Sequence, residues 1–217
     1  MNIKIDASIK NILSSFSICA VKMDVIYDDK GCLDELIKNV EKKVFNKYTL
    51  KDVLSIPLIK EARDGYKKMG KDPSRYRLSC ESLLRRIVKG NNLYRINNLV
   101  DIGNVLSIEI NRSVAVLDYD KIVGDIVIRM GTVNDEYYGI GRGLINVSNI
   151  PVYEDEVSPF GSTTSDTERT MITKDTKTIL LFIIYFKEAE YEDDFNLAIS
   201  LFEKYARAKN IESKYIT

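Results

Sequence analysis

Three observations predict an α+β fold in a single domain. Helix-like apolar spacing is concentrated between residues 33 and 110, and short β-branched segments separated by Gly, Asn and Asp follow between residues 114 and 154. A fully apolar stretch at residues 178–186 then predicts one buried central strand. Helices and strands that are segregated along the chain favour α+β over a doubly wound parallel sheet. A length of 217 residues fits one domain, or one domain with a helical extension.

The first half of the chain is expected to hold one strand and several helices. β-Branched and aromatic residues at 16–27 predict the strand. Thr49 followed by Asp52 is typical of a helix N-cap, Pro57 suits a first helical turn, and Ser79 is expected to cap a further helix. The expected helices lie at about 33–46, after Thr49, from Pro57 to Gly70, from Ser79 to Gly90 and over 99–110.

The second half is expected to be mainly β-structure. A polar segment at 159–170 is predicted to be a hydroxyl-rich loop ahead of the buried strand. Apolar residues at helical spacing predict a final amphipathic helix at 190–208. The predicted short strands lie at 114–117, 125–130, 137–140, 144–147 and 151–154.

Composition excludes several kinds of chemistry. The sequence contains no histidine, which removes Ser-His and Cys-His nucleophile pairs and imidazole acid-base catalysis. No glycine-rich phosphate loop follows a predicted strand, and the three cysteines lack paired spacing, so we expect no cofactor and no metal. The longest apolar run is too short to cross a bilayer and the N-terminus has no signal-peptide core, so we expect a cytoplasmic protein without a membrane segment.

Charge is balanced over the whole chain but uneven along it. The formal net charge is zero, yet residues 60–95 hold eleven Lys or Arg against four acidic residues and so carry +7. A segment of this kind can guide an anionic partner such as RNA to one face of the molecule. It is also typical of solvated helix faces, and both interpretations stay open.

The helix predicted over 99–110 carries the first candidate ligand-binding residues. Asp101, Asn104 and Ser107 share one face at i, i+3 spacing and could form a polar stripe. An asparagine in mid-helix is otherwise unfavourable, because its side chain competes for backbone hydrogen bonds. The alternatives are that Asp101 pairs with a neighbouring arginine or a cap, and that Asn104 bonds to a loop.

Two further groups could recognise an anionic or polar ligand. Arg75 and Arg77 flank Tyr76, a pattern that suits a nucleotide end by charge and stacking, or equally a core tyrosine between two solvated arginines. A hydroxyl-rich group with one guanidinium could bind a carboxylate, a ribose edge or a phosphate, or form a solvent loop with side-chain turns. Its members are Ser162, Thr163, Thr164, Ser165, Asp166 and Arg169.

Two stretches resemble a known family. One contains Val100-Asp101-Ile102-Gly103-Asn104 and, further on, Leu117-Asp118-Tyr119-Asp120-Lys121-Ile122-Val123-Gly124; the other is the segment 161–182. Together they resemble the B-three/B-four tRNA-editing domain of the phenylalanyl-tRNA synthetase beta subunit, and in particular bacterial-type stand-alone proteins built from this domain. The resemblance implies a β-sandwich of unusual topology with flanking helices. It covers a core at about 60–185, with a strand and helix portion at 1–59 before it.

The same resemblance implies a function. We expect an aminoacyl-tRNA-binding or RNA-binding protein, with trans-editing deacylation of mischarged tRNA as its activity, and not a complete synthetase. A histidine and a glutamate of the family fall here on Ala115 and Phe182, so no catalytic residue is carried over. The alternative is a non-enzymatic protein that binds a free amino acid or small metabolite in an apolar pocket, and a third option is an interaction domain with a vestigial pocket.

Overall fold

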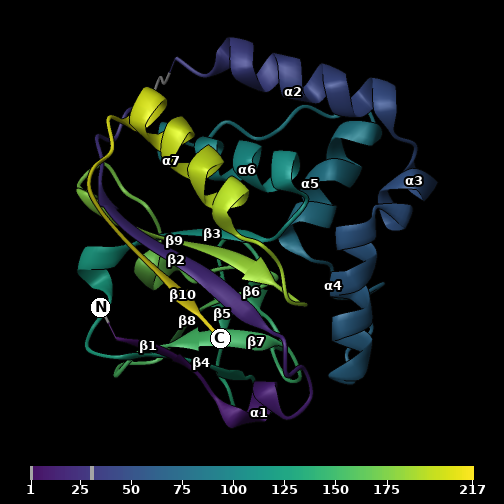
Figure 1. The fold of residues 1–217 in the computed structure, drawn as a ribbon, viewed down its shortest axis with the longest axis vertical. Helices are drawn as coiled ribbons and strands as arrows, with labels where there is room; N and C mark the ends of the chain where they lie inside the picture. Colours follow the sequence, from purple (N-terminus) through teal and green to yellow (C-terminus); the bar gives the residue numbers. More distant parts are fainter. Residues whose placement is uncertain (1, 30–31) are drawn as a thin grey trace.

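Two four-stranded sheets stack face to face in the computed structural model, which describes residues 2–29 and 32–217 (Figure 1). The first sheet is antiparallel throughout and has the order β10-β2-β9-β3. The second has the order β1-β4-β7-β8, with β1 parallel to β4. The strands are β1 Ile3–Ile5, β2 Ser17–Asp24, β3 Val114–Asp118, β4 Ile126–Met130, β7 Pro151–Glu154, β8 Pro159–Ser162, β9 Thr178–Tyr185 and β10 Lys209–Ile216.

The predicted central strand is β9, which lies between β2 and β3. It is apolar on both faces because both are covered: the second sheet packs on one face and helices on the other. The rings of Phe182 on β9 and Tyr153 on β7 meet edge to face at 5.0 Å and join the two sheets. On the opposite face, the guanidinium of Arg112 lies 4.3 Å from the ring of Tyr185.

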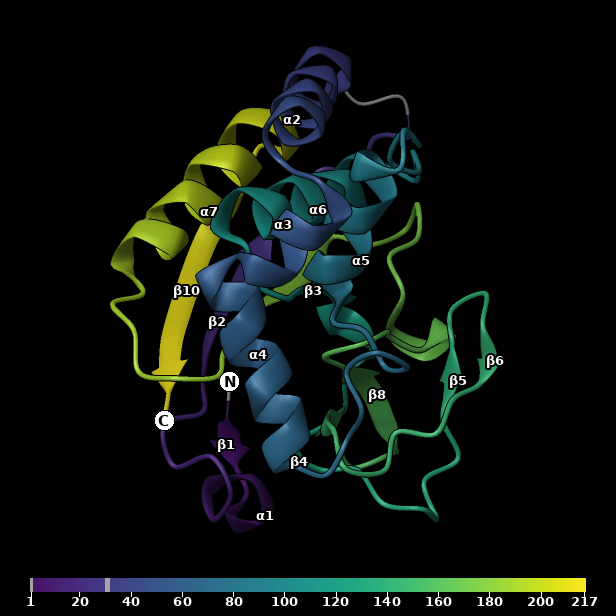
Figure 2. The same ribbon diagram turned by 90° about the vertical axis from the view of Figure 1, so that its right-hand side faces the viewer.

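Most of the helices gather on one side of the first sheet, whereas α1 packs against β4 of the second sheet (Figures 1 and 2). Helix α6 packs on β3 and α7, and α5 joins α6 to α2 and α3. Thr49 and Asp52 form the capping box at the start of α3, and Pro57 begins α4. The helices are α1 Ala7–Lys10, α2 Asp34–Lys47, α3 Leu50–Ser55, α4 Pro57–Lys68, α5 Ser79–Val88, α6 Asn98–Ile110 and α7 Glu192–Ala206, with 3₁₀ turns η1 Tyr119–Lys121 and η2 Glu168–Thr170.

Two local predictions are corrected, and one strand is added. Ser79 is the first residue of α5 and its side chain makes no capping bond, since Leu78 occupies the cap position. The segment 159–170 is not a solvent loop: it forms β8 and η2, and Thr163 and Thr170 are buried. Strand β10 was not predicted because its residues are mostly polar and exposed, as an edge strand allows. The α+β class and the sandwich with flanking helices are confirmed.

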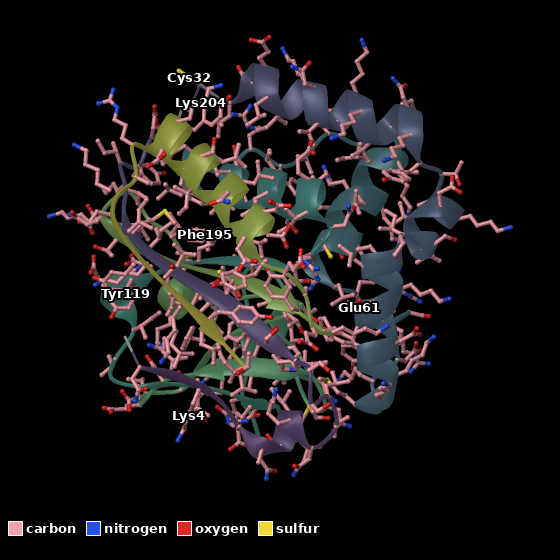
Figure 3. All side chains as sticks on the ribbon, viewed as in Figure 1. Lys4, Cys32, Glu61, Tyr119, Phe195 and Lys204 are labelled. Carbon is pink, nitrogen blue, oxygen red and sulfur yellow. The ribbon has the colours of Figure 1, made fainter. Side chains whose placement is uncertain are left out.

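Charged side chains surround the molecule (Figure 3). Cys32 lies at the periphery, whereas Cys19 and Cys80 are buried. Within residues 2–29 and 32–217, no group of three or more Cys, Asp or Glu side chains is arranged to hold a metal ion. No helix in this part of the chain is long and apolar enough to span a bilayer.

Candidate functional site

A small cavity lies at the edge of the first sheet, where α6, β3 and the turn after β8 meet. Its volume is about 180 Å³. Most of its wall is aliphatic, and Asp166 is the one charged residue in it. The lining residues are Ile96, Val100, Gly103, Asn104, Val114, Val116, Ile140, Asp166, Met171 and Ile172. The structure therefore brings together two sequence-predicted residues, Asn104 and Asp166, that are far apart along the chain.

In the described part of the chain, the two polar side chains of the cavity leave hydrogen-bonding atoms without a protein partner. The Asn104 amide makes no hydrogen bond there, and the Oδ1 atom of Asp166 is buried without a hydrogen-bond partner. Burial raises the pKa of Asp166 to about 7, and the backbone N–H of Ser162 only partly opposes this shift. A buried carboxylate oxygen without a hydrogen-bond partner is uncommon, because most buried polar atoms are hydrogen-bonded.

Hydrogen bonds hold the backbone around Asp166 in place. Ile140 on the neighbouring hairpin donates its N–H to the Asp166 carbonyl at 2.9 Å. The hydroxyl of Ser162 donates to the Ser165 carbonyl at 2.7 Å and accepts the Ser165 N–H at 3.1 Å. The Tyr137 hydroxyl also donates to that carbonyl. Ser162, predicted as a ligand-binding residue, thus shapes the turn that presents Asp166.

A basic groove of about 430 Å³ lies beside the cavity. Arg75 and Arg77 are exposed and flank Tyr76, whose ring lies 3.7 Å from the Lys71 ammonium group. Neither Arg77 nor Arg142 forms an ion pair with another described residue. The groove is lined by Arg75, Tyr76, Arg77, Ser82, Arg142, Leu144, Ile145, Asn146 and Thr164.

The cavity and the groove share two walls. One is the hairpin of β5 (Tyr138–Gly139) and β6 (Gly143–Leu144), which stands at the edge of the molecule beside β8 (Figure 2). It contributes Ile140 to the cavity and Arg142 to the groove. The other wall is the turn after β8, which contributes Asp166 to the cavity and Thr164 to the groove. One ligand could therefore occupy both hollows.

Asp101 and Ser107 do not form a polar stripe with Asn104. Asp101 accepts a hydrogen bond from Arg95 Nε at 2.8 Å, the alternative that the sequence left open. Ser107 is buried and donates to the Arg112 carbonyl at 2.6 Å. Neither lines the cavity.

Thr163 and Arg169 also have structural partners instead of lining either hollow. The Thr163 hydroxyl hydrogen-bonds to that of buried Tyr66. Arg169 binds both carboxylate oxygens of Asp155, at 2.8 and 3.1 Å, and donates to the carbonyls of Lys121 and Ser158. Of the hydroxyl-rich group, only Thr164 and Asp166 face a hollow.

Ala115 and Phe182 are direct register partners on β3 and β9. Both side chains are buried, and Phe182 packs on Tyr153 in the interior between the sheets. The expected apolar pocket does not lie there. It lies across β3, where the alternation of a strand directs Val114 and Val116 toward α6.

Gly103 permits the close approach of α6 to β3. A Cβ atom at this position would lie 2.4 Å from Val116 Cγ2, and the β-branched valine has little freedom to move. We expect Gly103→Ala to destabilise the protein by about 1–2 kcal/mol, because overpacking outweighs the gain in helix propensity. The melting temperature should fall by roughly 2–8 °C.

A double-mutant cycle checks the cause. If the alanine clashes with Val116, then Val116→Ala should cost less in the Gly103→Ala background than in the wild type. Additive effects of the two substitutions would show that the contact at Val116 is not the source of the loss.

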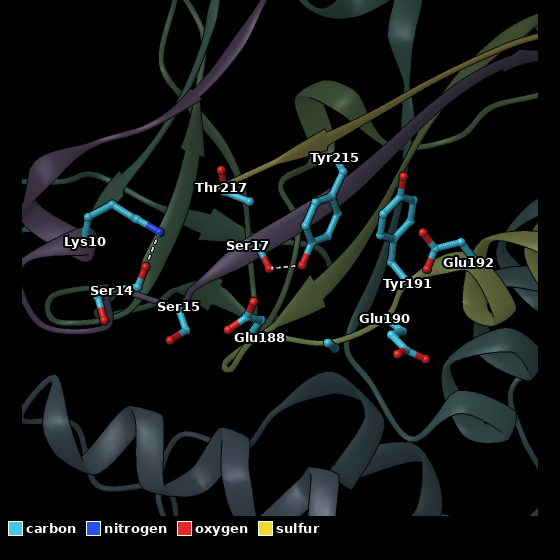
Figure 4. Close-up of a pocket in the computed structure, with 11 residues that line it drawn as sticks. Lys10, Ser14, Ser15, Ser17, Glu188, Glu190, Tyr191, Glu192, Tyr215 and Thr217 are labelled. Carbon is cyan, nitrogen blue, oxygen red and sulfur yellow. Dashed lines mark hydrogen bonds between the residues drawn. The ribbon is translucent and has the colours of Figure 1, made fainter.

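A third hollow, of about 410 Å³, opens near the C-terminal end of β10 (Figure 4). The rings of Tyr191 and Tyr215 stack in it at 4.3 Å, and the Tyr215 hydroxyl hydrogen-bonds to Ser17. Of its acidic side chains, Glu188 and Glu190 come from the segment that joins β9 to α7, and Glu192 is the first residue of α7. Its volume is larger than that of the cavity, but it contains none of the ligand-binding residues predicted from the sequence.

Sequence reasoning missed the aliphatic wall of the cavity and Arg142. The branched residues of the wall look like ordinary core positions, so nothing in their pattern marks a cavity. Arg142 lies between Gly141 and Gly143, both of which have positive φ. This Gly-Arg-Gly spacing signals a tight turn that exposes the arginine, and it could have been recognised.

Fold and site together define an α+β sandwich domain with a small cavity and an adjoining basic groove at one sheet edge. The chain belongs to the B3/4 domain family, whose model matches residues 61–212. Among curated proteins, the phenylalanine–tRNA ligase beta subunit of Fusobacterium nucleatum is 31% identical over 106 residues, which are 48% of this chain and 13% of that protein. The chain thus matches only a small part of that relative's length.

A solved structure has a similar fold. An N-terminal fragment of the phenylalanyl-tRNA synthetase beta subunit from Pyrococcus horikoshii is similar over 100% of this chain and 51% of that one, with a TM-score of 0.52. The two are 12% identical in sequence, so this likeness shows the fold alone.

Proposed function

We propose that this protein binds aminoacyl-tRNA, with the aminoacyl group in the cavity and phosphates of the tRNA 3′ end in the basic groove, and that it removes amino acids from mischarged tRNA. The observation that carries the proposal is the shared pair of walls between the two hollows. The relationship to a phenylalanine–tRNA ligase beta subunit supports tRNA as the partner. Charged tRNA is a cytoplasmic ligand, which agrees with the location expected from the sequence.

The charges in each hollow suit the two parts of such a ligand. Three arginines and an aromatic ring line the groove, and no acidic residue does, which favours phosphates and a stacked base. The +7 segment contributes mainly Arg75 and Arg77 here, because others of its basic residues are paired internally. Arg63 and Arg85, for example, both contact Glu81.

The cavity favours an ester over a free amino acid. Its single charged group is the Asp166 carboxyl, and no lysine or arginine lines it. The carboxylate of a free amino acid would be placed near Asp166 without a counter-charge, which is unfavourable in a partly desolvated site. In an aminoacyl ester that carboxylate is absent. This charge arrangement argues against the alternative of a free-amino-acid sensor.

Hydrolysis of the ester adds water across the acyl C–O bond and releases the amino acid and the tRNA hydroxyl. With no histidine in the chain, we expect a positioned water and electrostatic stabilisation, with no covalent intermediate on the protein. The test is to mix pure protein with alanyl-, seryl- and tyrosyl-charged tRNA and follow release of the amino acid. If no charged tRNA releases its amino acid faster and none binds in a salt-dependent way, the proposal is refuted.

The groove should determine the salt dependence of binding. If each of its three arginines contacts one phosphate, affinity should fall roughly tenfold or more between 50 and 200 mM salt. We expect the triple variant Arg75→Ala, Arg77→Ala, Arg142→Ala to bind charged tRNA with a slope of log affinity against log salt that is smaller by about 2.

The matched control is Lys38→Ala, which removes a positive charge from the exposed face of α2. It should change neither the affinity nor the salt slope. A triple variant that keeps the wild-type slope would show that the phosphates bind elsewhere on the protein.

A further inference from the structure

The polar atoms of the cavity do not satisfy one another in the described structure. The Asp166 Oδ1 atom is buried and accepts no hydrogen bond, and the Asn104 amide has no partner. The native fold nevertheless fixes Asp166 in place, through the Ile140 N–H and the turn held by Ser162. A buried acceptor atom that has no donor and whose backbone is fixed by hydrogen bonds is the arrangement expected where a ligand supplies the donor.

We infer that the cavity recognises the α-ammonium group of a small aliphatic aminoacyl ester, with Asp166 as the acceptor of that ammonium group and Asn104 as a donor to the acyl oxygen. This inference rests on the proposed function, because it takes the ligand to be an aminoacyl ester. The reason is complementarity of charge: Asp166 is the one charged residue in the lining, so a cation completes the site. Ammonium–carboxylate hydrogen bonds are the stronger class.

Size and lining restrict the side chain of the ligand. A volume of about 180 Å³ is below the range of drug-sized pockets, which begins at roughly 300 Å³. Apart from Asp166 and Asn104, the wall is formed by Val, Ile and Met side chains and Gly103, with no further polar side chain to pair a hydroxyl. A small side chain of the alanine or valine type fits this wall, whereas the hydroxyl of serine or tyrosine would be left unpaired.

Asp166 is the one residue in the cavity lining whose side chain can gain or lose a proton in the pH range of a binding experiment. The titratable groups around it are the hydroxyls of Tyr137 and Tyr153. Burial raises the pKa values of both hydroxyls, and the negative charge of Asp166 raises them further. Behind them, burial raises the pKa of Tyr66 to about 12. These hydroxyls stay neutral across the pH range of a binding experiment.

The experiment compares two probes that both lack a carboxylate, L-valinamide and N-acetyl-L-valinamide, by calorimetry at pH 7.5. We expect valinamide to bind and the acetylated probe, which has no cationic nitrogen, to bind about 10- to 100-fold more weakly. Asp166→Asn should weaken the binding of valinamide by a similar factor and leave the affinity for the acetylated probe unchanged. Asp120→Asn, which removes an exposed carboxylate, is the matched control and should change neither.

The pH dependence is a second readout. Affinity for valinamide should rise between pH 5.5 and about 7 as Asp166 ionises, and fall again as the amine loses its proton near its ordinary pKa of about 8. Equal binding of the two probes, no binding of either, or a valinamide affinity that declines steadily from pH 5.5 would overturn the inference. The steady decline would mean that Asp166 acts as a protonated donor.

Binding experiments with charged tRNA test this inference and the proposed function separately. If valinamide binds as expected but valyl-tRNA does not bind, the proposed function fails and the ammonium site stands. If valyl-tRNA and N-acetyl-valyl-tRNA bind and react equally well, the proposed function stands and the ammonium site is wrong.

Discussion

Asp166→Asn is expected to raise the free energy of unfolding at pH 8 by about 2–4 kcal/mol, although it removes a group that we assign to ligand binding. In the folded protein, burial raises the pKa of Asp166 to about 7, whereas an aspartate in the unfolded chain has an ordinary pKa of about 3.9. The carboxyl therefore keeps its proton in the folded state over a pH range in which the unfolded state has lost it. Each pH unit in that range lowers stability by up to about 1.4 kcal/mol.

The sign of the pH dependence makes this prediction specific. The folded state binds more protons than the unfolded state between about pH 4 and pH 7, so wild-type stability falls as pH rises through this window and is level above it. The amide of asparagine does not titrate, so the gain should vanish near pH 4. Chemical denaturation of both proteins at pH 4, 6 and 8 measures it. A variant that is no more stable than wild type at pH 8 would mean that Asp166 is well solvated.

Such a gain would show that the site is maintained against stability. A residue that serves binding often makes the free protein less stable than an uncharged replacement at the same position would. Ligand should reverse the order, because an ammonium group bound only by ionised Asp166 stabilises the wild type and not the variant. Thermal unfolding at pH 8 with and without valinamide would measure this exchange.

Local patterns predicted the fold better than they predicted the site. The apolar run at 178–186 identified β9 because a strand covered on both faces has no polar alternation to conceal it. The capping box of Thr49 and Asp52 is a local motif, and the structure has it where it was predicted. Strand β10 has no such signal, since its pairing with β2 depends on backbone hydrogen bonds at a solvated edge.

The chemistry of the site depends on contacts that sequence spacing does not encode. Asn104 and Asp166 were both candidates, but only the packing of the β5–β6 hairpin and the turn after β8 against α6 brings them to one cavity. Asp101 has the same side-chain type as Asp166 and pairs with Arg95 instead. Hydroxyl and carboxyl composition therefore indicated a segment that borders the cavity, without indicating which of its residues face it.

Arg169→Met is expected to destabilise the protein by about 2–4 kcal/mol at pH 7, and to lower the melting temperature by roughly 5–15 °C. Asp155 is buried, and its carboxylate accepts both guanidinium hydrogen bonds together with the N–H groups of Val123, Val157 and Ser158. Without Arg169, a buried carboxylate keeps only its backbone donors. Because the Arg169 side chain is partly exposed, we expect a smaller loss of stability than for breaking a fully buried ion pair.

The pH dependence of this loss has the opposite sign to that of Asp166. Burial acts to raise the pKa of Asp155, but the backbone N–H of Val123 and the guanidinium of Arg169 outweigh it and hold the pKa below its ordinary value. The stabilisation from ionised Asp155 is therefore present above about pH 4 and is lost as pH falls below that value. The difference between wild type and Arg169→Met should shrink accordingly in acid denaturation experiments.

Arg75→Met is the matched control, because Arg75 is an exposed arginine of the groove. It should leave stability unchanged and weaken binding of charged tRNA, whereas Arg169→Met should do the reverse at temperatures where it remains folded. The sequence offered both arginines as ligand-binding residues, and this pair of variants distinguishes them. If Arg169→Met were as stable as the wild type and lost tRNA binding, Arg169 would belong to the site and the Asp155 contact would be incidental to the fold.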